Sequence, residues 1–145
     1  MPAPRPALWA DPLYLAALAA ALPAVAIIAG ITPLQLALHW PGWTPIVLLI
    51  LVTPVLEEIV FRAGLQDALA TRGSYRLAGL TLANVLTALM FCLVHLFRHA
   101  PAWALATIVP ALVFGWAYER HPRLVAPILL HALYNLAYLV LLSPA

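Results

Sequence analysis

Two adjacent acids and an arginine, Glu57-Glu58-Ile59-Val60-Phe61-Arg62, lie in the middle of an apolar run that extends from residue 41 to residue 73. A helix needs about 20 mostly apolar residues to span a bilayer, and this run is longer. Ionisable side chains inside such a helix are costly, so they face a protein interior or a wet cavity and usually mark function. The run therefore predicts a membrane-embedded helix that carries chemistry.

The composition of the whole chain also indicates a membrane protein. Of the 145 residues, 66% are hydrophobic and only 8% are charged, whereas roughly a quarter of the residues in soluble domains are charged. The basic residues are all arginines and are scattered over the expected turns, so they form no patch that could bind nucleic acid. We expect a polytopic protein in contact with the lipid bilayer.

Turn signals divide the chain into five apolar segments of roughly spanning length. The predicted spans are Leu13–Ile31, Thr44–Ala68, Leu77–Phe97, Ala102–Tyr118 and Leu124–Leu142. Because the connections are short, residues 1–145 are predicted to form a single all-α membrane helix bundle with about five transmembrane helices. Pro54 and Pro110 lie inside two of these spans and could break the helices there.

The arginines predict the orientation of the bundle, because short cytoplasmic loops carry an excess of basic residues. One side of the membrane would have Arg5, Arg72, Arg76, Arg120 and Arg123, and the other only Arg98. The N-terminus is therefore predicted to be cytoplasmic and the C-terminus external. The composition, rich in alanine, leucine and arginine without lysine, indicates a GC-rich bacterial genome and hence a bacterial inner membrane.

The acids of the second span differ in what they can pair with. Glu58 and Arg62 are four residues apart, so they share one helix face and can form an ion pair. Glu57 is rotated by about 100° toward a neighbouring helix and has no cation of its own. An unpaired carboxylate in an apolar site suits a general base, so the acid that Arg62 does not neutralise is a candidate for that role. The Glu58–Arg62 pair could instead be a structural clamp.

The third span carries a polar and aromatic stripe. Its members follow helical spacings of three and four and are Asn84, Thr87, Phe91 and His95. Such a stripe faces neighbouring helices rather than lipid. We expect the ring of Phe91, one turn before His95, to pack against the imidazole and orient it.

The fifth span places His131 and Asn135 four residues apart and therefore on one face. Two hydrogen-bond donors on a rigid helix could hold an oxyanion in a water-poor site. They could instead bond to another helix, as polar residues of membrane helices commonly do. The other histidines, His39, His99 and His121, fall in expected turns and are expected to be solvated.

The ordered set of motifs resembles the CPBP family, which contains the type II CAAX prenyl endopeptidases and the bacteriocin-processing, or Abi, proteases. The motifs are Glu57-Glu58-x-x-x-Arg62, Phe91-x-x-x-His95 and His131-x-x-x-Asn135, within residues of about 54 to 140. The resemblance implies an intramembrane protease in which Glu57 is the base and His95 its partner on the water. It also implies that His131 and Asn135 donate to the oxyanion and that Glu58 and Arg62 position the site.

The resemblance further implies a membrane-anchored protein or peptide as substrate, with the C-terminal tail as one candidate cleavage region. Family members commonly have more than five spans, so this chain is close to a minimal core. An oligomeric partner could therefore supply the parts that grip the substrate. The segment Phe114-Gly115-Trp116 corresponds to a small-residue packing segment that the family often has.

Two alternatives stay open. Family members have also been treated as metalloproteases, and Glu57, Glu58, His95 and His131 could ligate Zn²⁺. The chain lacks the His-Glu-x-x-His arrangement that places two ligands and a base on one turn, so we favour glutamate chemistry without a cofactor. Intramembrane charges would also suit an ion-coupled transporter or a non-catalytic partner such as an immunity or scaffold protein, although no inverted repeat is visible.

Overall fold

The computed structural model describes residues 6–73, 75–77 and 79–144, and most of them are helical. In chain order the elements are η1 (Leu8–Ala10), α1 (Pro12–Ala19), α2 (Ala21–Ile31), β1 (Leu34–Leu36), α3 (Trp43–Ile46), η2 (Val47–Val52), α4 (Thr53–Glu58), η3 (Ile59–Gln66), α5 (Asp67–Ala70), β2 (Arg76–Leu77), β3 (Leu80–Thr81), α6 (Leu82–Leu96), α7 (Pro101–Ala106), α8 (Ile108–Arg120), α9 (Val125–Leu141) and β4 (Leu142–Pro144). Here η1 is a 3₁₀ helix, whereas η2 and η3 are π-helical. The predicted all-α class is confirmed, with two short two-stranded sheets added.

These elements join into five helical segments that correspond to the predicted spans. Three are long and apolar enough to cross a membrane, Pro12–Ile31, Trp43–Ala70 and Pro101–Arg120, and the shorter apolar helices are Leu82–Leu96 and Val125–Leu141. The predicted start of the third span is wrong, because β2 and β3 form a hairpin there. Helix α6 begins only at Leu82, after its N-cap Thr81, whose hydroxyl accepts a hydrogen bond from the N–H of Asn84.

Prolines explain the irregular turns, since proline lacks a donor and its ring clashes with the carbonyl four residues earlier. Pro23 and Pro110 follow the breaks at Ala20 and Thr107, which separate α1 from α2 and α7 from α8. Pro54 follows the π-helical η2, and the segment continues through it. The second span is therefore widened at its proline, while the fourth is interrupted before its proline.

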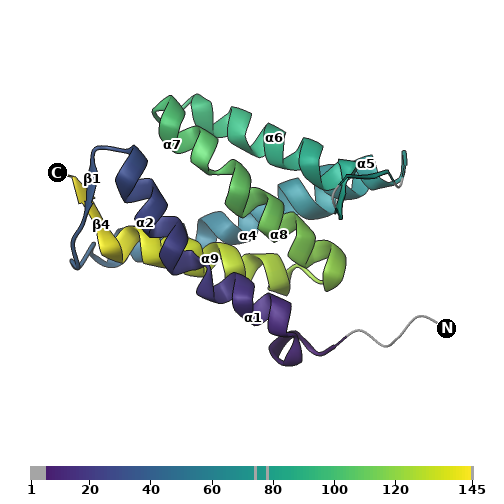
Figure 1. The fold of residues 1–145 in the computed structure, drawn as a ribbon, viewed down its shortest axis with the longest axis horizontal. Helices are drawn as coiled ribbons and strands as arrows, with labels where there is room; N and C mark the ends of the chain where they lie inside the picture. The colour runs from purple at the N-terminus through teal and green to yellow at the C-terminus, as the bar shows by residue number, and fades with distance from the viewer. Residues whose placement is uncertain (1–5, 74, 78, 145) are drawn as a thin grey trace.

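The segments run alternately in opposite directions. Figure 1 shows the N-terminal end, the β2–β3 hairpin and the α8–α9 turn at one end of the molecule, and the α6–α7 turn and β4 at the other. The arginine-bearing turns after α5 and α8 thus share one end, and Arg5 lies outside the described residues. Strand β4 pairs antiparallel with β1, which ties the C-terminal end to the connection after α2.

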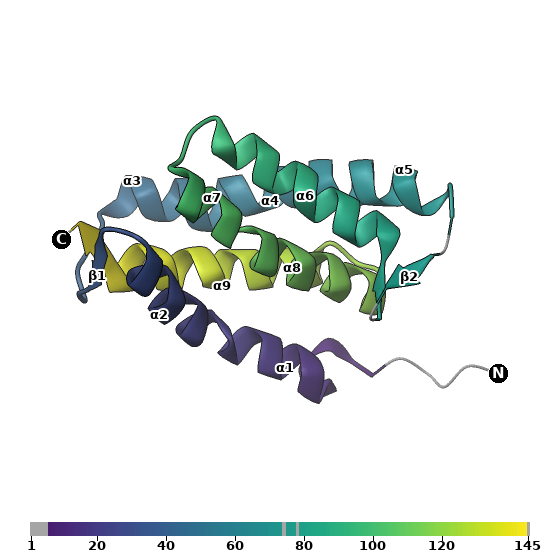
Figure 2. The same cartoon turned by 45° about the horizontal axis from the view of Figure 1, so that its top comes forward.

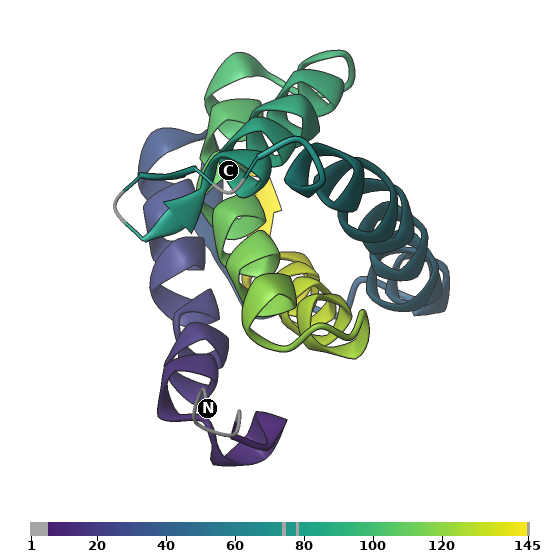
Figure 3. The same cartoon turned by 90° about the vertical axis from the view of Figure 1, so that its right-hand side faces the viewer.

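Helices α8 and α9 lie between the N-terminal helices and the second segment, as the end-on view in Figure 3 shows. In Figure 2 the second segment runs alongside α6 and α9, and α1 and α2 cross on the opposite side. The second segment exposes apolar side chains such as Leu56 and Val60 (58% and 61%), whereas its Glu58 and Arg62 are 0% exposed. Apolar surface outside and charge inside is the arrangement expected of a helix in lipid.

Candidate active site

The second segment buries one polar stripe along its inner face. Glu58, Arg62 and Gln66 are spaced four apart and are at most 2% exposed. A spacing of four stays in line on a helix wider than an α-helix, and η3, which carries Arg62 and Gln66, is π-helical. π-Helical turns frequently occur at functional sites. The stripe places its polar groups against α6, α8 and α9.

Arg62 has a partner for each guanidinium nitrogen. Its Nε donates to Glu58 Oε2 at 2.7 Å, Nη1 to Gln66 Oε1 at 3.0 Å and Nη2 to the carbonyl of Ala111 at 3.1 Å. The predicted pairing of Glu58 with Arg62 is confirmed. Because the carboxylate and the guanidinium are both fully buried, removing either would leave an uncompensated charge in the bundle.

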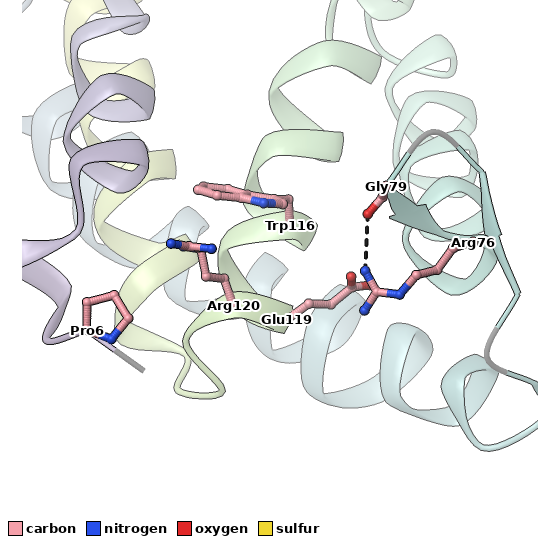
Figure 4. A pocket seen from close by; sticks show the side chains of 6 residues that line it. All are labelled: Pro6, Arg76, Gly79, Trp116, Glu119 and Arg120. Carbon is pink, nitrogen blue, oxygen red and sulfur yellow. Dashed lines mark hydrogen bonds between the residues drawn. The ribbon is translucent and has the colours of Figure 1, made fainter. Parts of the chain in front are cut away.

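Gln66 extends this polar chain toward the arginine-bearing end. Its Nε2 donates to the carbonyl of Gly115 at 3.2 Å and to Glu119 Oε1 at 2.9 Å, and the Thr81 hydroxyl donates to the same carboxylate. Figure 4 shows Glu119 beside a cavity of about 240 Å³, where Arg76 donates to the carbonyl of Gly79. The polar chain therefore runs from Glu58 to this cavity.

Close approach of α6, η3 and α8 depends on Gly115. A Cβ atom there would lie 2.0 Å from Asn84 Oδ1 and 2.9 Å from Gln66 Oε1. Asn84 is 0% exposed and donates to the carbonyl of Leu112 at 3.0 Å. Asn84, Thr87 and Phe91 are all buried, so the predicted inward stripe of the third span is confirmed there.

His131 lies between the two glutamates. Its Nδ1 is 2.8 Å from Glu58 Oε1, and its Nε2 is 3.7 Å from Glu57 Oε2. Because Glu58 is paired with Arg62 and accepts as a carboxylate, His131 Nδ1 is the donor. The imidazole stacks on Phe114 with 4.9 Å between ring centroids. Nε2 is therefore held near Glu57 but beyond hydrogen-bond distance of it.

His95 is oriented by the residue one turn before it. Its Nδ1 is 2.8 Å from the carbonyl oxygen of Phe91, and the two rings stack at 4.3 Å, so the predicted packing is confirmed. Because a carbonyl only accepts, Nδ1 carries the hydrogen and Nε2 is left as an acceptor in the neutral ring. The edge of Phe91 also meets His131, with centroids 6.0 Å apart.

A cavity of about 370 Å³ is lined by three of the predicted catalytic residues, His95, His131 and Asn135, and by the apolar face of α2. Asn135 Nδ2 donates to the carbonyl of Leu49 at 2.8 Å. An amide nitrogen carries two hydrogens, so one stays available to a ligand. The fourth predicted residue, Glu57, is 28% exposed, and its Oε2 is buried without a hydrogen-bond partner in the described part of the chain.

The four candidate metal ligands are not arranged as a metal centre. Within residues 6–73, 75–77 and 79–144, no group of three or more His, Cys, Asp or Glu side chains is placed to hold a metal ion. Glu58 is bound by Arg62 and His131, and His95 Nδ1 by the carbonyl of Phe91. Glu58 would have to leave Arg62 to ligate zinc, whereas His95 and His131, which use Nδ1 in these contacts, keep Nε2 available, as ligating histidines usually do.

A second ionic cluster joins the N-terminal helices to α8. Asp11 caps α1 and accepts from Arg120 Nε, from Arg120 Nη2 at 3.1 Å and from His121 Nε2 at 2.9 Å. The hydrogen bond from Arg120 holds the pKa of the Asp11 carboxyl at about 2. The expectation that His121 is solvated is wrong, because Asp11 binds it and only 8% of it is exposed. His39 and His99 are exposed.

Gln66, Glu119 and Asp11 were not among the residues predicted from the sequence. The spacing of four from Arg62 to Gln66 was a usable signal, since it continues the spacing from Glu58 to Arg62. No local pattern could have found Asp11 and Arg120, which are 109 residues apart.

Comparison with protein families matches residues 38–137 to the family described as type II CAAX prenyl endopeptidase Rce1-like. The match covers well over half of the chain and contains every residue of the three motifs. No curated protein and no solved structure matches the chain.

Proposed function

Since the chain belongs to the type II CAAX prenyl endopeptidase Rce1-like family, we propose that it hydrolyses a peptide bond of a membrane-associated substrate with water activated by Glu57. The family makes the chain a protease, and its apolar helices make it an integral membrane protein. The glutamic mechanism rests on one observation. Glu57 lies beside His131, which the buried Glu58–Arg62 pair orients.

In the proposed reaction, Glu57 takes a proton from water as the water oxygen attacks the substrate carbonyl carbon. His95 Nε2 accepts a hydrogen bond from the second hydrogen of that water and so aligns the water. Glu57 then gives its proton to the leaving nitrogen as the carbon–nitrogen bond breaks. The products are a carboxylic acid, which keeps the second water hydrogen, and an amine.

We assign the oxyanion to donors on α9. His131 donates through Nε2 in its cationic form, which Glu58 balances at Nδ1, and Asn135 donates through the hydrogen that Leu49 does not use. Glu57, Glu58, Arg62 and cationic His131 then sum to zero charge, which suits a buried cluster in a membrane. Proton uptake by Glu57 makes the cluster positive as the oxyanion forms.

We propose a membrane-anchored protein or peptide as substrate, cut near its C-terminal tail, and a bacterial inner membrane as location. The turns that carry Arg72, Arg76, Arg120 and Arg123 lie at the end opposite to Arg98, which supports a cytoplasmic N-terminus. Because the C-terminus is predicted to be external, alkaline phosphatase fused to it should be active. If the phosphatase fusion were inactive and a fluorescent reporter fused to the same terminus were fluorescent, the topology would be the reverse.

The experiment that tests the function compares wild type with Glu57→Gln, His95→Ala and Asn135→Ala in the same membranes. Terminal-peptide mass spectrometry should find new protein ends with wild type and none with the correctly folded variants. Equal processing by all four proteins would overturn the protease and favour the transporter or scaffold.

Zinc is the competing chemistry. We propose that purified, active protein contains no stoichiometric metal and keeps its activity in chelator. Stoichiometric zinc whose removal abolishes cleavage, with recovery on adding zinc back, would replace glutamate chemistry by zinc chemistry.

A further inference from the structure

The cavity beside His95 is mostly apolar, so its few polar groups are informative. On the α2 side it is lined by alanine, valine, isoleucine and proline, and on the other side by aromatic, polar and some aliphatic residues from α6 to α9. Several polar groups on this wall are already bonded within the fold. The Thr107 hydroxyl donates to Ala104, and the Tyr134 hydroxyl donates to Ala17.

Trp103 on α7 lines the same cavity and differs from these two residues. Its Nε1 is buried and has no hydrogen-bond partner among the described residues. An indole nitrogen can only donate, and orphaned buried N–H groups are rare in folded proteins. The ring packs against His99 with 4.0 Å between centroids and lies 5.7 Å from His95 and 5.8 Å from Tyr138, so a small movement beside the exposed His99 would uncover the N–H next to His95.

A peptide bond that is cut inside a membrane has the complementary deficiency. The substrate must be unwound from any helix before water can reach the scissile carbonyl, and its backbone carbonyls then lose their helical donors. Unpaired backbone groups are not tolerated in an apolar medium, so the enzyme has to supply donors. A further donor next to the proposed catalytic histidine, in addition to those assigned to the oxyanion, meets that requirement.

We propose that the indole N–H of Trp103 binds a backbone carbonyl of the extended substrate next to the scissile bond. This inference rests on the proposed function and names a substrate-binding residue that the motifs do not contain. The substrate class it implies is an unwound peptide segment with apolar side chains, which the α2 wall accommodates.

The test is Trp103→Phe, which removes the N–H and keeps an aromatic ring. The substrate is a peptide that spans the cleavage site found by terminal-peptide mass spectrometry, presented in lipid nanodiscs. We expect KM to rise about tenfold, the effect of one lost hydrogen bond, with kcat nearly unchanged. Trp116→Phe is the matched control, because Trp116 lines the other cavity and should leave both constants unchanged.

An unchanged KM would overturn the inference, and so would a fall in kcat alone, which would mean that the ring only positions His95. A second readout does not need turnover. The indole N–H signal of Trp103 is identified in an NMR spectrum of ¹⁵N-labelled protein as the one that Trp103→Phe lacks. Adding the peptide to ¹⁵N-labelled Glu57→Gln should shift this signal, and no shift at saturating peptide would overturn the assignment. Glu57→Gln that still cleaves the peptide would instead overturn the proposed base, whatever the indole signal shows.

Discussion

Two groups of buried polar side chains differ in their hydrogen bonding. One is the polar chain from Glu58 to Glu119, and the other comprises Glu57 and the wall of the larger cavity. In the polar chain, Arg62 and Gln66 each form several hydrogen bonds. Beside His131, Glu57 Oε2 is buried without a hydrogen-bond partner in the described ranges, and so is Nε1 of Trp103 on the wall of the larger cavity. Asn84 Oδ1 and Thr87 Oγ1, which lie inside the bundle on α6, also have no partner among the described residues. Satisfied groups hold helices together, whereas unsatisfied groups beside a proposed catalytic residue are candidates to bind a ligand. The difference separates the framework of this protein from its working surface.

The largest expected effects come from exchanging one residue in each region. Arg62→Leu leaves the Glu58 carboxylate buried without its guanidinium, so we expect a loss of about 3–5 kcal/mol in unfolding free energy. Glu57→Gln should keep the stability and reduce turnover by about 10²–10⁴-fold, as expected for loss of a general base. Thermal unfolding in detergent and cleavage assays measure the two quantities. A stable Arg62→Leu protein would contradict the framework role of the polar chain.

Gly115→Ala tests how tightly the framework is packed. The added Cβ would meet Asn84 and Gln66, so we expect a destabilisation of about 1–3 kcal/mol, typical of overpacking. Gly64→Ala is the matched control, because its Cβ would come only within 3.6 Å of the Ile59 carbonyl and helical alanine is favoured over glycine. Equal melting temperatures for the two variants would show that α6 and α8 can separate without cost.

Phe91→Leu tests the cavity side. The stacked ring that holds the His95 imidazole would be lost, while the carbonyl that accepts from His95 Nδ1 would stay. We expect kcat to fall roughly tenfold with a smaller change in KM, because alignment of the water is impaired while substrate contacts persist. Kinetics on the same peptide check this, and an unchanged kcat would assign the ring to packing alone.

The smallest effect is expected at Asp11, outside both regions. Its folded pKa of about 2 is below the ordinary 3.8, so the ionised carboxyl stabilises the fold above about pH 4 and this contribution is lost as the pH falls toward 2. Asp11→Asn should therefore melt lower than wild type at neutral pH and approach it at acidic pH. Asp67→Asn, at an exposed carboxyl, is the control. If the melting temperatures of wild type and Asp11→Asn changed in parallel with pH, the ionised Asp11 carboxyl would not stabilise the fold through this cluster.

Contacts within one helix could be read from spacing, and contacts between helices could not. Glu58 with Arg62 and Phe91 with His95 are each four residues apart, so helical geometry alone placed them together. The bond from Asn135 to Leu49 has no such signature. It depends on which faces of the second and fifth segments meet.

Residue spacing and hydropathy were sufficient for the membrane environment, the five helical segments and the faces that carry charge, because each depends on local periodicity and on transfer from water to lipid. Packing alone joined Glu58 to His131 and Gln66 to Glu119, and left Trp103 Nε1 without a partner among residues 6–73, 75–77 and 79–144. The physical reason is that helix crossings depend on small contact residues such as Gly115 and on turns altered by proline. Their combined effect on the register between helices is a property of the whole bundle.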